Sequence, residues 1–376
     1  MTLALDSTLV DDLANYGAED VRKCYQCGNC TAVCTNAQMP FLFPRQSTLY
    51  IQLGLTDKLK GSLEPWLCYY CDECSDQCPR HAEPGETMMS LRRWLTAQYD
   101  FTGISKLFYT SWKAEIGIIL LVAAATAAGF LAFGFSQGDI QTYDGPTAFL
   151  PSHAVHLFDW GMAGILTLLL GINAARMWWF TIGRDKSLRV SISQYIKNMY
   201  LVPLHFFTQR KYADCEQKRP WAGHLVLMLS YVTMFVLIMF FLHQVQAGPE
   251  IDWSVHAFGY VATLGLIGAV VFAVIQRLRA TATQFRHSHE SDWIFLALLF
   301  FVATTGILQH ALHRAGLDFA ANITYVIHLS GVVPMLVLEV PFSKWSHMAY
   351  RPLALFLAQL RTRGASGLEA RQKGVR

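Results

Sequence analysis

Eight of the nine cysteines in this 376-residue chain fall into two runs with the same spacing. Each run reads C-x2-C-x2-C-x3-C, a spacing typical of bacterial ferredoxins with two 4Fe–4S clusters. In that pattern three close thiolates bind one cluster, and the fourth cysteine ligates the other cluster. The runs are Cys24, Cys27, Cys30 and Cys34, then Cys68, Cys71, Cys74 and Cys78.

This crossed pattern divides the eight thiolates between two predicted 4Fe–4S clusters. Structural zinc sites use separated C-x2-C pairs with four ligands per ion, and two four-cysteine runs fit that arrangement poorly. The ninth cysteine, Cys215, stands alone, and no role is predicted for it. Cluster 1 is predicted to use Cys24, Cys27, Cys30 and Cys78, and cluster 2 to use Cys68, Cys71, Cys74 and Cys34.

Histidines in or beside long apolar runs form a second set of candidate ligands. Imidazole inside a bilayer is costly and indicates a functional site. His224 and His243 lie 19 residues apart, as do His328 and His347, which is a rise of about 28 Å along a helix. If the two helices are antiparallel, His224 matches His347 in depth and His243 matches His328. The pattern predicts two bis-histidine haem b sites, a ligation that suits electron transfer because no position is left for a substrate.

Several other residues compete with His243 for the outer haem. The competing histidines are His156, His256, His310 and His313, and Met234 is a further candidate. The alternative is that all these histidines are interfacial, where imidazole costs little.

Two charged residues also fall within the apolar runs. Glu339 is predicted to handle quinone protons, because a carboxylate at that depth is costly without a function. Arg176 either pairs with a haem propionate or extends its head group to the interface.

The elements that must position these residues follow from composition. Hydrophobic residues make up 53% of the chain and charged residues 15%, against about 25% charged in soluble domains. Six apolar runs within residues 113–343 are each near the roughly 20 residues that span a bilayer. We predict membrane helices near 113–135, 154–180, 221–243, 254–276, 292–313 and 321–343.

The predicted fold class is all-α. A helical two-cluster ferredoxin domain is expected over 1–105, a six-helix haem b membrane domain over 106–350, and a basic cytoplasmic tail over 351–376. The stretch between the cysteine runs, PRQSTLYIQLGLTDKLKG, predicts helix with a break at Gly61, unlike the small βαβ ferredoxin. Within 183–220, SISQYIKNMYLVPLHFF predicts either an amphipathic surface helix or a plain linker.

The distribution of Lys and Arg predicts the orientation in the membrane. Basic residues crowd 184–219, 277–286 and 344–376, whereas the connections on the other side carry Arg314 among acidic residues. Both termini and the cysteine domain are therefore expected on the cytoplasmic side of the inner membrane. The first 20 residues resemble no secretory signal, which favours a reducing compartment. The net charge of +3 does not suggest a nucleic-acid partner.

The residues resemble two known families. The N-terminal hundred residues resemble the iron–sulfur C subunit of heterodisulfide reductase, most closely in WLCYYCDECSDQCPR at 66–80. The C-terminal part resembles the haem b subunit of respiratory nitrate reductase, through His328 to His347 with Pro341-Phe342-Ser343-Lys344. That resemblance implies two haems held by the third and sixth helices here, and a five-helix core to which the first helix is an addition. In that family the two histidines of the earlier helix lie closer together than His224 and His243.

The fusion of both parts resembles the C subunit of the quinone-interacting membrane-bound oxidoreductase complexes. This resemblance implies two flavoprotein partners, the A and B subunits of the same complex. It also implies electron exchange between menaquinone and adenylylsulfate reductase in dissimilatory sulfur metabolism.

Four functions compete on the sequence. The first is a quinone-linked electron-transfer subunit, and the second is a membrane subunit of a heterodisulfide reductase-like complex serving another disulfide or sulfur substrate. Catalytic disulfide reduction by the chain itself is disfavoured, because no two cysteines are adjacent. A redox sensor is disfavoured because no kinase, effector or DNA-binding segment is visible. No glycine-rich nucleotide motif appears, so flavin is expected on a partner.

Overall fold

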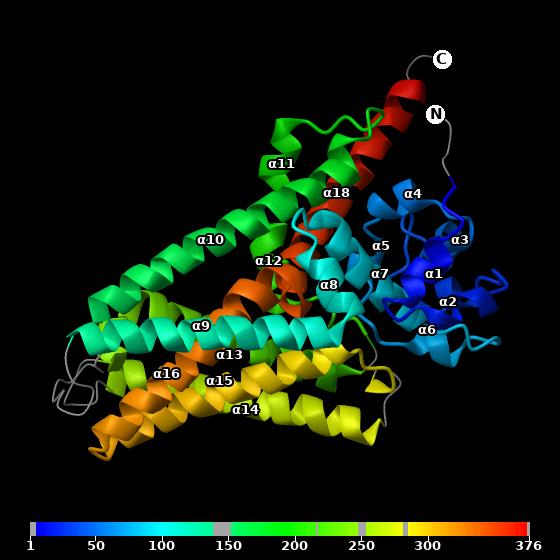
Figure 1. Cartoon of the computed structure of the whole chain (residues 1–376). Helices are drawn as coiled ribbons and strands as arrows, with labels where there is room; N and C mark the ends of the chain where they lie inside the picture. Colours follow the sequence, from blue (N-terminus) through cyan, green and yellow to red (C-terminus); the bar gives the residue numbers. More distant parts are fainter. Residues whose placement is uncertain (1–4, 138–151, 216, 247–252, 281–284, 374–376) are drawn as a thin grey trace.

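The computed structural model describes residues 5–137, 152–215, 217–246, 253–280 and 285–373. Within these ranges every element is helical, apart from one isolated bridge between Gln38 and Phe41. The predicted all-α class is therefore confirmed. Figure 1 shows a group of short N-terminal helices at one end of a layer of long helices, with both ends of the chain on the side of the short helices.

The short helices surround α7, whose residues are nearly all buried. Hydrophobic side chains from most of them meet in one core that includes Leu13, Ile51, Trp66 and Trp94. The bounds are α1 (Leu9–Ala14), α2 (Asn29–Ala32), α3 (Arg45–Gln52), α4 (Thr56–Lys60), α5 (Glu64–Leu67), α6 (Glu73–Asp76), α7 (Pro84–Tyr99) and α8 (Ile104–Thr110), with a 3-10 turn at Glu19–Lys23.

The stretch between the cysteine runs is helical as predicted, but it breaks earlier as well as at Gly61. Gly54 separates α3 from α4 with φ +65°, and a Cβ there would lie 2.2 Å from the Asp6 carbonyl oxygen. The Gly54 carbonyl in turn accepts from the Asp6 N–H at 2.9 Å. Only glycine fits this close approach, whereas Gly61 caps α4 as expected.

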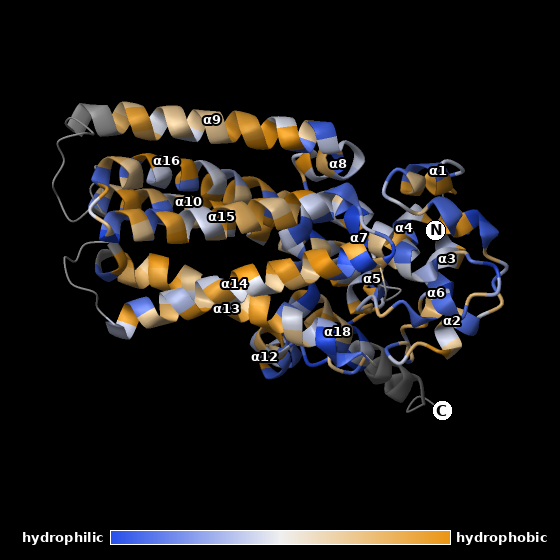
Figure 2. Ribbon diagram, turned by 90° about the horizontal axis from the view of Figure 1, so that it is seen from below, coloured by the Kyte–Doolittle hydropathy of each residue, from blue (hydrophilic) through white to orange (hydrophobic). Residues whose placement is uncertain are grey.

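Six long helices carry the apolar runs, and Figure 2 shows them as mostly hydrophobic. Their candidate membrane spans are Trp112–Phe133, His153–Gly183, Lys218–Leu242, Trp253–Arg279, Glu290–Arg314 and Asp318–Phe342. These agree with the six predicted spans. The helices themselves are α9 (Trp112–Gln137), α10 (Ser152–Trp178), α13 (Lys218–Gln246), α14 (Trp253–Arg279), α15 (Glu290–Arg314) and α16 (Asp318–Pro334).

The first of these helices is peripheral and the last is central. Half of the apolar window of the α16 span is buried by the rest of the chain, against 6% for α9. Helix α16 packs between α15 and α9. That this helix is an addition to a five-helix core stays a prediction.

The last span does not run straight to His347. A π-helical turn follows at Met335–Glu339, then α17 (Val340–Phe342), and the helix ends at Ser343 with φ −127° and ψ −146°. A 3-10 turn at Lys344–Ser346 leads to α18 (His347–Lys373), so His347 begins a new helix. Pro334 and Pro341 each remove a backbone donor, which explains why the ladder is irregular here. The prediction that His328 and His347 lie on one straight helix, with a rise of about 28 Å between them, was therefore wrong.

Helix α18 ties the two parts of the chain together. Its residues Tyr350, Ala354, Leu357 and Leu360 are buried in the same core as Trp66. The helix thus crosses the expected boundary at 350. The domain limits stay a prediction, but the segment after 350 is a packed helix through its first turns.

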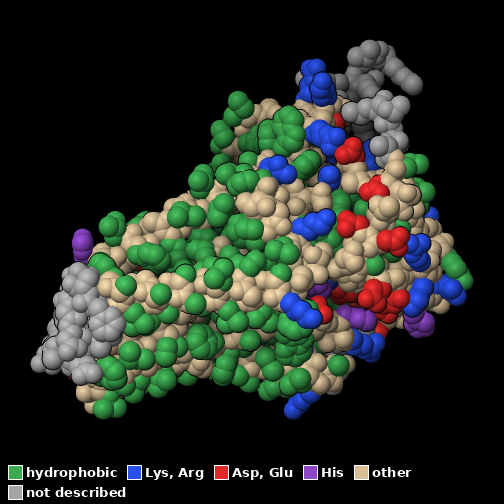
Figure 3. Space-filling view, viewed as in Figure 1, with side chains coloured by type: hydrophobic (Ala, Val, Ile, Leu, Met, Phe, Trp, Pro, Cys, Tyr) green, Lys and Arg blue, Asp and Glu red, His purple; other side chains and the backbone are tan. Residues whose placement is uncertain are grey.

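Basic residues expected at the membrane surface also hold the cysteine domain. They reach it from three segments of the chain: the turn after α10, the connection between α14 and α15, and α18. Arg184 pairs with Asp57 at 3.1 Å, Arg286 with Asp76 at 3.4 Å, Arg361 donates to Gly61 O at 3.0 Å, and Arg351 donates to Cys68 O at 2.8 Å. Figure 3 shows charged side chains gathered at this end, whereas hydrophobic ones cover the long helices.

The connection after α10 forms two short helices, so the surface-helix prediction is favoured over a plain linker. They are α11 (Ile192–Asn198) and α12 (Leu201–Thr208). Ile192, Ile196 and Tyr200 are exposed apolar side chains of this segment, which is the pattern of a helix at a membrane interface.

Candidate metal centres

The two cysteine runs fold in the same way. Cys24 and Cys68 each end a short helix in extended conformation, with ψ of 126° and 136°. The residue two places on donates its N–H to the thiol: Gln26 to Cys24 Sγ and Tyr70 to Cys68 Sγ, each at 3.4 Å. Both donors have positive φ, at 62° and 56°. Each loop thus wraps its backbone around its first sulfur.

The next turn of each run is also the same. Gly28 and Asp72 begin α2 and α6 in left-handed conformation, with φ of 88° and 66°. Each short helix then carries the third cysteine of its run. Helices α2 and α6 contact each other, and Asn29 Nδ2 donates to Gln77 O at 2.6 Å. This contact brings the end of each run to the other run.

The structure groups the thiols in the crossed sets. Burial raises the pKa of Cys30, and the neighbouring thiols of Cys24, Cys27 and Cys78 raise it further. Burial likewise raises the pKa of Cys34 to about 12, with Cys68 and then Cys71 contributing. The pKa of Cys74 is raised by burial and by Cys68, Cys71 and Cys34. The fourth cysteine of each run therefore neighbours the other run, although its role as a ligand stays a prediction.

Among the residues that the structure describes, no three His, Cys, Asp or Glu side chains converge closely enough to hold a single metal ion. A tetrahedral zinc ion with Zn–S bonds of about 2.3 Å holds its sulfurs within roughly 4 Å of one another. A cubane spreads the same number of thiolates more widely. The preference for a cluster over zinc rests on the spacing of the two cysteine runs.

Cys215 is not isolated, contrary to the expectation from sequence. It is buried, and its thiol lies beside the Cys71 thiol. The turn after α12 brings it there: Cys215 N–H donates to Tyr212 O at 3.2 Å, and Lys218 Nζ donates to Cys215 O at 2.7 Å. No spacing rule could have predicted a contact between segments so far apart in the chain.

His224 on α13 and His347 at the start of α18 face each other. Their ring centres lie 5.8 Å apart with the planes at 60°. His224 Nδ1 is 2.8 Å from Gln209 Oε1, and His347 Nδ1 hydrogen-bonds Lys344 O. Both oxygens are acceptors, so each Nδ1 carries the proton and each Nε2 lone pair is available. Metal-ligating histidines are held in this way by a second hydrogen bond.

A haem iron would fit between these rings. Two imidazoles that ligate one metal through bonds of about 2.0–2.1 Å place their ring centres roughly 6 Å apart. The 5.8 Å separation of His224 and His347 matches that distance. The pair can therefore supply both axial ligands of the inner haem.

His328 faces α15. The Nδ1 atom of His328 lies 3.1 Å from Thr305 Oγ1 on that helix, and a Cβ added at Gly306 would lie 3.0 Å from the His328 ring. It lines a cavity of about 750 Å³ within the bundle, which lies in the range of cofactor pockets of about 300–1,000 Å³. The side chain of His243 lies outside the described residues, so its pairing with His328 is neither supported nor opposed.

The histidines that compete with His243 for the outer haem contact various groups. His256 and His310 have ring centres 5.3 Å apart, and His310 Nε2 is 2.7 Å from Tyr260 OH. Both line the cavity, as do His313 and Met234. His156 Nε2 is instead 2.8 Å from Met239 O, and His313 pairs with Asp318 at 3.4 Å.

Glu339 is fully buried and does not line the cavity. Both oxygens of its carboxyl group lack a hydrogen-bond partner among the described residues. Glu115 on α9 lies close by, and Ser343 Oγ donates to Glu115 Oε1 at 2.8 Å. Glu115 was not among the predicted site residues. A carboxylate within the first apolar run was nevertheless a signal in the sequence for a functional group.

Arg176 has a different role from either predicted one. Its Nε donates to Tyr99 O at 2.7 Å and its Nη2 donates to Gln98 O at 3.0 Å. These carbonyls end α7, where a cation is favoured by the helix dipole. Arg176 therefore joins α10 to the cysteine domain and does not pair with Glu339.

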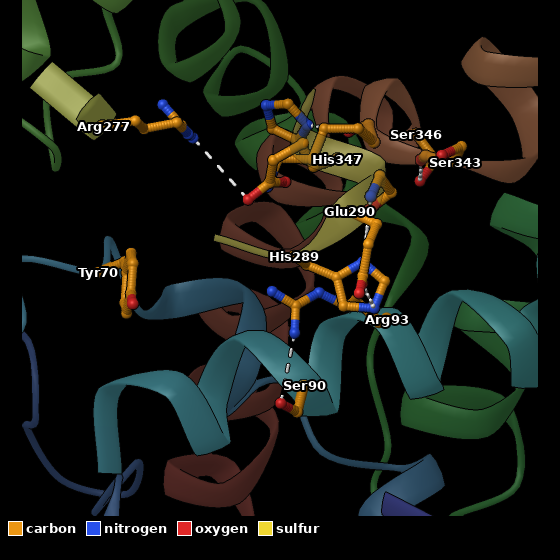
Figure 4. A network of polar contacts seen from close by, with 12 residues as sticks. Tyr70, Ser90, Arg93, Arg277, His289, Glu290, Ser343, Ser346 and His347 are labelled. Carbon is orange, nitrogen blue, oxygen red and sulfur yellow. Dashed lines mark hydrogen bonds and ion pairs between the residues drawn. The ribbon is translucent and has the colours of Figure 1, made fainter. Parts of the chain in front are cut away.

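Figure 4 shows the polar network between the cluster 2 loop and the His347 segment. Tyr70 OH donates to Glu86 Oε2 at 3.0 Å, and buried Arg93 pairs with Glu86 Oε1 at 2.8 Å. Beside Arg93 lies His289, whose pKa is lowered to about 4, first by burial and then by Arg93. Asp292 on α15 pairs with Lys344, whose carbonyl holds His347, and with Arg277 at 3.8 Å.

Comparisons with known proteins agree with this site. Residues 23–83 match the family described as 4Fe-4S dicluster domain. A protein of Archaeoglobus profundus that is named as similar to the C subunit of heterodisulfide reductase is 32% identical over 96 residues, which is 25% of this chain and 51% of that protein. The iron-sulfur C subunit of the CoB--CoM heterodisulfide reductase of Methanopyrus kandleri is 40% identical over 60 residues, 16% of this chain and 31% of that protein.

The chain thus spans about half or less of the length of these curated relatives. No solved structure is significantly similar to it. The relatives are iron–sulfur subunits of oxidoreductase complexes. The N-terminal part of this chain is therefore a 4Fe-4S domain, and six helices long and apolar enough to cross a membrane follow it.

Proposed function

We propose that the chain is a membrane electron-transfer subunit of a quinone-linked oxidoreductase. It connects the menaquinone pool, through haem b and two 4Fe–4S clusters, to the cytoplasmic flavoprotein A and B subunits of the same complex. The complex takes part in dissimilatory sulfur metabolism, where adenylylsulfate reductase is the soluble protein that exchanges electrons with it. It spans the inner membrane with both termini in the cytoplasm.

The observation that carries this proposal is the His224–His347 pair. Both rings keep Nε2 available at a separation suited to one iron, and both are fixed by oxygen acceptors. The pair lies at the end of the bundle where the thiol sets dock, because Arg351, one turn after His347, donates to Cys68 O at 2.8 Å. A redox group held there is next to cluster 2, as an electron relay requires.

Oxidation of menaquinol to menaquinone would release two electrons and two protons, so the proposal includes a proton acceptor. Glu339 is the proposed acceptor. Its full burial, its two carboxyl oxygens without a hydrogen-bond partner among the described residues, and the nearby Glu115 support a group that exchanges a proton within the membrane. The second proposed haem uses His328, with His243 as its partner. The cavity beside His328 supports a bound cofactor at that depth.

The alternative is the membrane subunit of a heterodisulfide reductase-like complex that serves a different disulfide or sulfur substrate. The names of the relatives favour it. Reconstitution separates the two: purified chain with partner flavoproteins should pass electrons from menaquinol to adenylylsulfate reductase in the first case, and to a disulfide or sulfur acceptor in the second.

The first experiment is an optical and electron paramagnetic resonance redox titration of the purified full chain, with iron and haem counted. We expect low-spin haem b signals together with two distinct 4Fe–4S signals. His347→Ala and His224→Ala should each remove the same haem. Protein that binds tightly held zinc in place of iron, or binds no haem after expression with haem supplied, contradicts the proposal.

A further inference from the structure

Two tyrosine rings connect the cysteine domain to the histidine pair. Tyr69 lies in the second cysteine run, between Cys68 and Cys71, and Tyr212 lies in the turn after α12. Their rings stack with centres 5.4 Å apart and an interplanar angle of 24°. Offset stacking at this distance is a favourable aromatic contact. It is formed by segments that belong to different parts of the chain.

Tyr212 continues the contact toward the membrane. Its ring meets the edge of His224 with centres 6.1 Å apart and planes at 78°. A continuous series of ring contacts therefore runs from the cluster 2 loop through Tyr69 and Tyr212 to His224. From there the next ring is His347, at 5.8 Å.

Arg351 holds the cysteine end of this series. Its guanidinium carbon lies 3.7 Å above the Tyr69 ring, and its Nη2 donates to Cys68 O at 2.8 Å. Arg351 follows His347 by four residues on α18 and so lies on the same face of that helix. Helix α18 thus places His347 against His224 and, one turn later, Arg351 against Tyr69. Burial raises the pKa of Tyr212 to about 12, so its ring stays neutral.

The thiols of predicted cluster 1 are more exposed than those of cluster 2. Cys27 is exposed, and Tyr25 beside it is 66% exposed with the Arg80 guanidinium 4.2 Å above its ring. Cys68 and Cys74 of cluster 2 are buried. The two predicted clusters therefore differ in exposure: the cluster 2 loop is buried and stacks on Tyr212, whereas cluster 1 has a thiol at the surface.

We propose that electrons pass between the inner haem site and cluster 2 across the Tyr69–Tyr212 stack, with cluster 1 as the exchange point for the soluble partner. The inference rests on the proposed function. Each step moves one electron, so ferrous iron on one side is oxidised as one cluster on the other is reduced by one electron. The tyrosine rings keep their electrons and protons. They fill the gap that the electron tunnels across, and no bond forms or breaks.

The test compares Tyr212→Leu and Tyr69→Leu with Tyr212→Phe in the purified full chain. Leucine removes the ring, whereas phenylalanine keeps it and loses only the hydroxyl. Tyr195→Leu is the matched control, because Tyr195 also makes an aromatic contact, 6.1 Å from Phe356, away from this route. The fully reduced protein is mixed rapidly with ferricyanide, and haem and cluster absorbance are followed separately.

In the leucine variants haem oxidation should slow several-fold while cluster oxidation keeps its wild-type rate. Tyr212→Phe and Tyr195→Leu should behave as wild type, and the midpoint potentials and low-spin haem spectrum should be unchanged in all variants. If Tyr212→Leu loses haem through its contact with His224, Tyr69→Leu alone decides. Wild-type haem oxidation in a leucine variant with intact haem and clusters overturns the route. Absence of haem from the wild-type protein refutes the proposed function instead.

Discussion

His224 and His347 lie on helices that are far apart in the sequence, yet their ring centres lie 5.8 Å apart. Each ring is fixed by a different kind of acceptor, a side-chain amide for His224 and a main-chain carbonyl for His347. The carbonyl belongs to Lys344, and the ammonium group of Lys344 pairs with the buried carboxylate of Asp292. The orientation of the pair therefore depends on contacts outside the two helices.

Replacing Gln209 should loosen the inner haem. Gln209→Leu removes the acceptor for His224 Nδ1 without touching the ligating nitrogen. Loss of the hydrogen-bond partner of a metal-ligating histidine typically costs about 10–100-fold in metal affinity. Haem retention during dilution and the haem midpoint potential measure the effect.

Two controls accompany this variant. Gln209→Glu keeps an acceptor and should retain haem, whereas His287→Ala removes a half-exposed histidine paired with Glu83 and should change nothing. Equal haem retention in Gln209→Leu and wild type would show that the hydrogen bond does not support a ligand.

Crossed cluster ligation predicts an unusual pattern of damage. Cys78→Ser should impair the cluster built by Cys24, Cys27 and Cys30, because Cys78 neighbours Cys30. Cys34→Ser should impair the cluster built by the second run. Iron content and the paramagnetic signal of each reduced cluster report the loss.

Cys215→Ser is the control for crossed ligation. It removes a buried thiol beside Cys71 that belongs to neither predicted set, and both clusters should retain their full iron content. Loss of the signal from the mutated residue's own run would contradict crossing.

How far the sequence predicted this site depended on the range of each contact. Cysteine spacing predicted the sets because neighbouring cysteines in a short loop have few ways to face one cluster. Hydrophobic length likewise predicted the six spans. The path of His347 was not predictable from spacing, because the π-turn and the break at Ser343 depend on packing around Pro334 and Pro341.

Long-range partners were predicted poorly. Arg176 was expected to reach a propionate or the interface, but it caps α7. Tyr212 and Cys215 gave no signal at all, since nothing in a linker sequence shows that its turn docks on a cluster loop. Their positions follow from α12 and α18 packing together.

Glu64 predicts how stability depends on pH. It is buried at the start of α5, one carboxyl oxygen has no partner, and burial raises its pKa above the ordinary value of 4.5. A carboxyl group with a raised folded pKa destabilises the fold as pH rises through about 4.5 toward the folded value, because its charged form is favoured in the unfolded chain. Glu64→Gln should therefore stabilise the domain at pH 8, by about 1–3 kcal/mol, and have little effect below pH 4.

Thermal unfolding of the full chain in detergent, followed by tryptophan fluorescence at several pH values, measures this difference. The control is Glu19→Gln, since Glu19 is exposed. A Glu64→Gln difference that is the same at pH 4 and pH 8 would show that the charge of Glu64 is not responsible.

Glu339→Gln should slow reduction of the haems by a menaquinol analogue more than it alters their spectra. Quinol oxidation releases two protons, and Glu339 lies buried close to Glu115 in a place where an ionised carboxylate costs about 2.5–3.5 kcal/mol. Glutamine keeps the size and a donor but cannot take up a proton. If the two carboxyl groups act as one acceptor, Glu115→Gln should slow the reaction as well.

The competing location is the outer end of the cavity, where His310 and Tyr260 lie 2.7 Å apart. Glu339 does not line that cavity. The decisive comparison is therefore between Glu339→Gln and Tyr260→Phe in the same assay, across pH and with haem content measured. Slower reduction in Glu339→Gln alone supports proton uptake at the carboxyl pair. Unchanged rates there, together with slower reduction in Tyr260→Phe, would place the quinone at the outer end and leave Glu115 and Glu339 as a structural contact between α9 and the bundle.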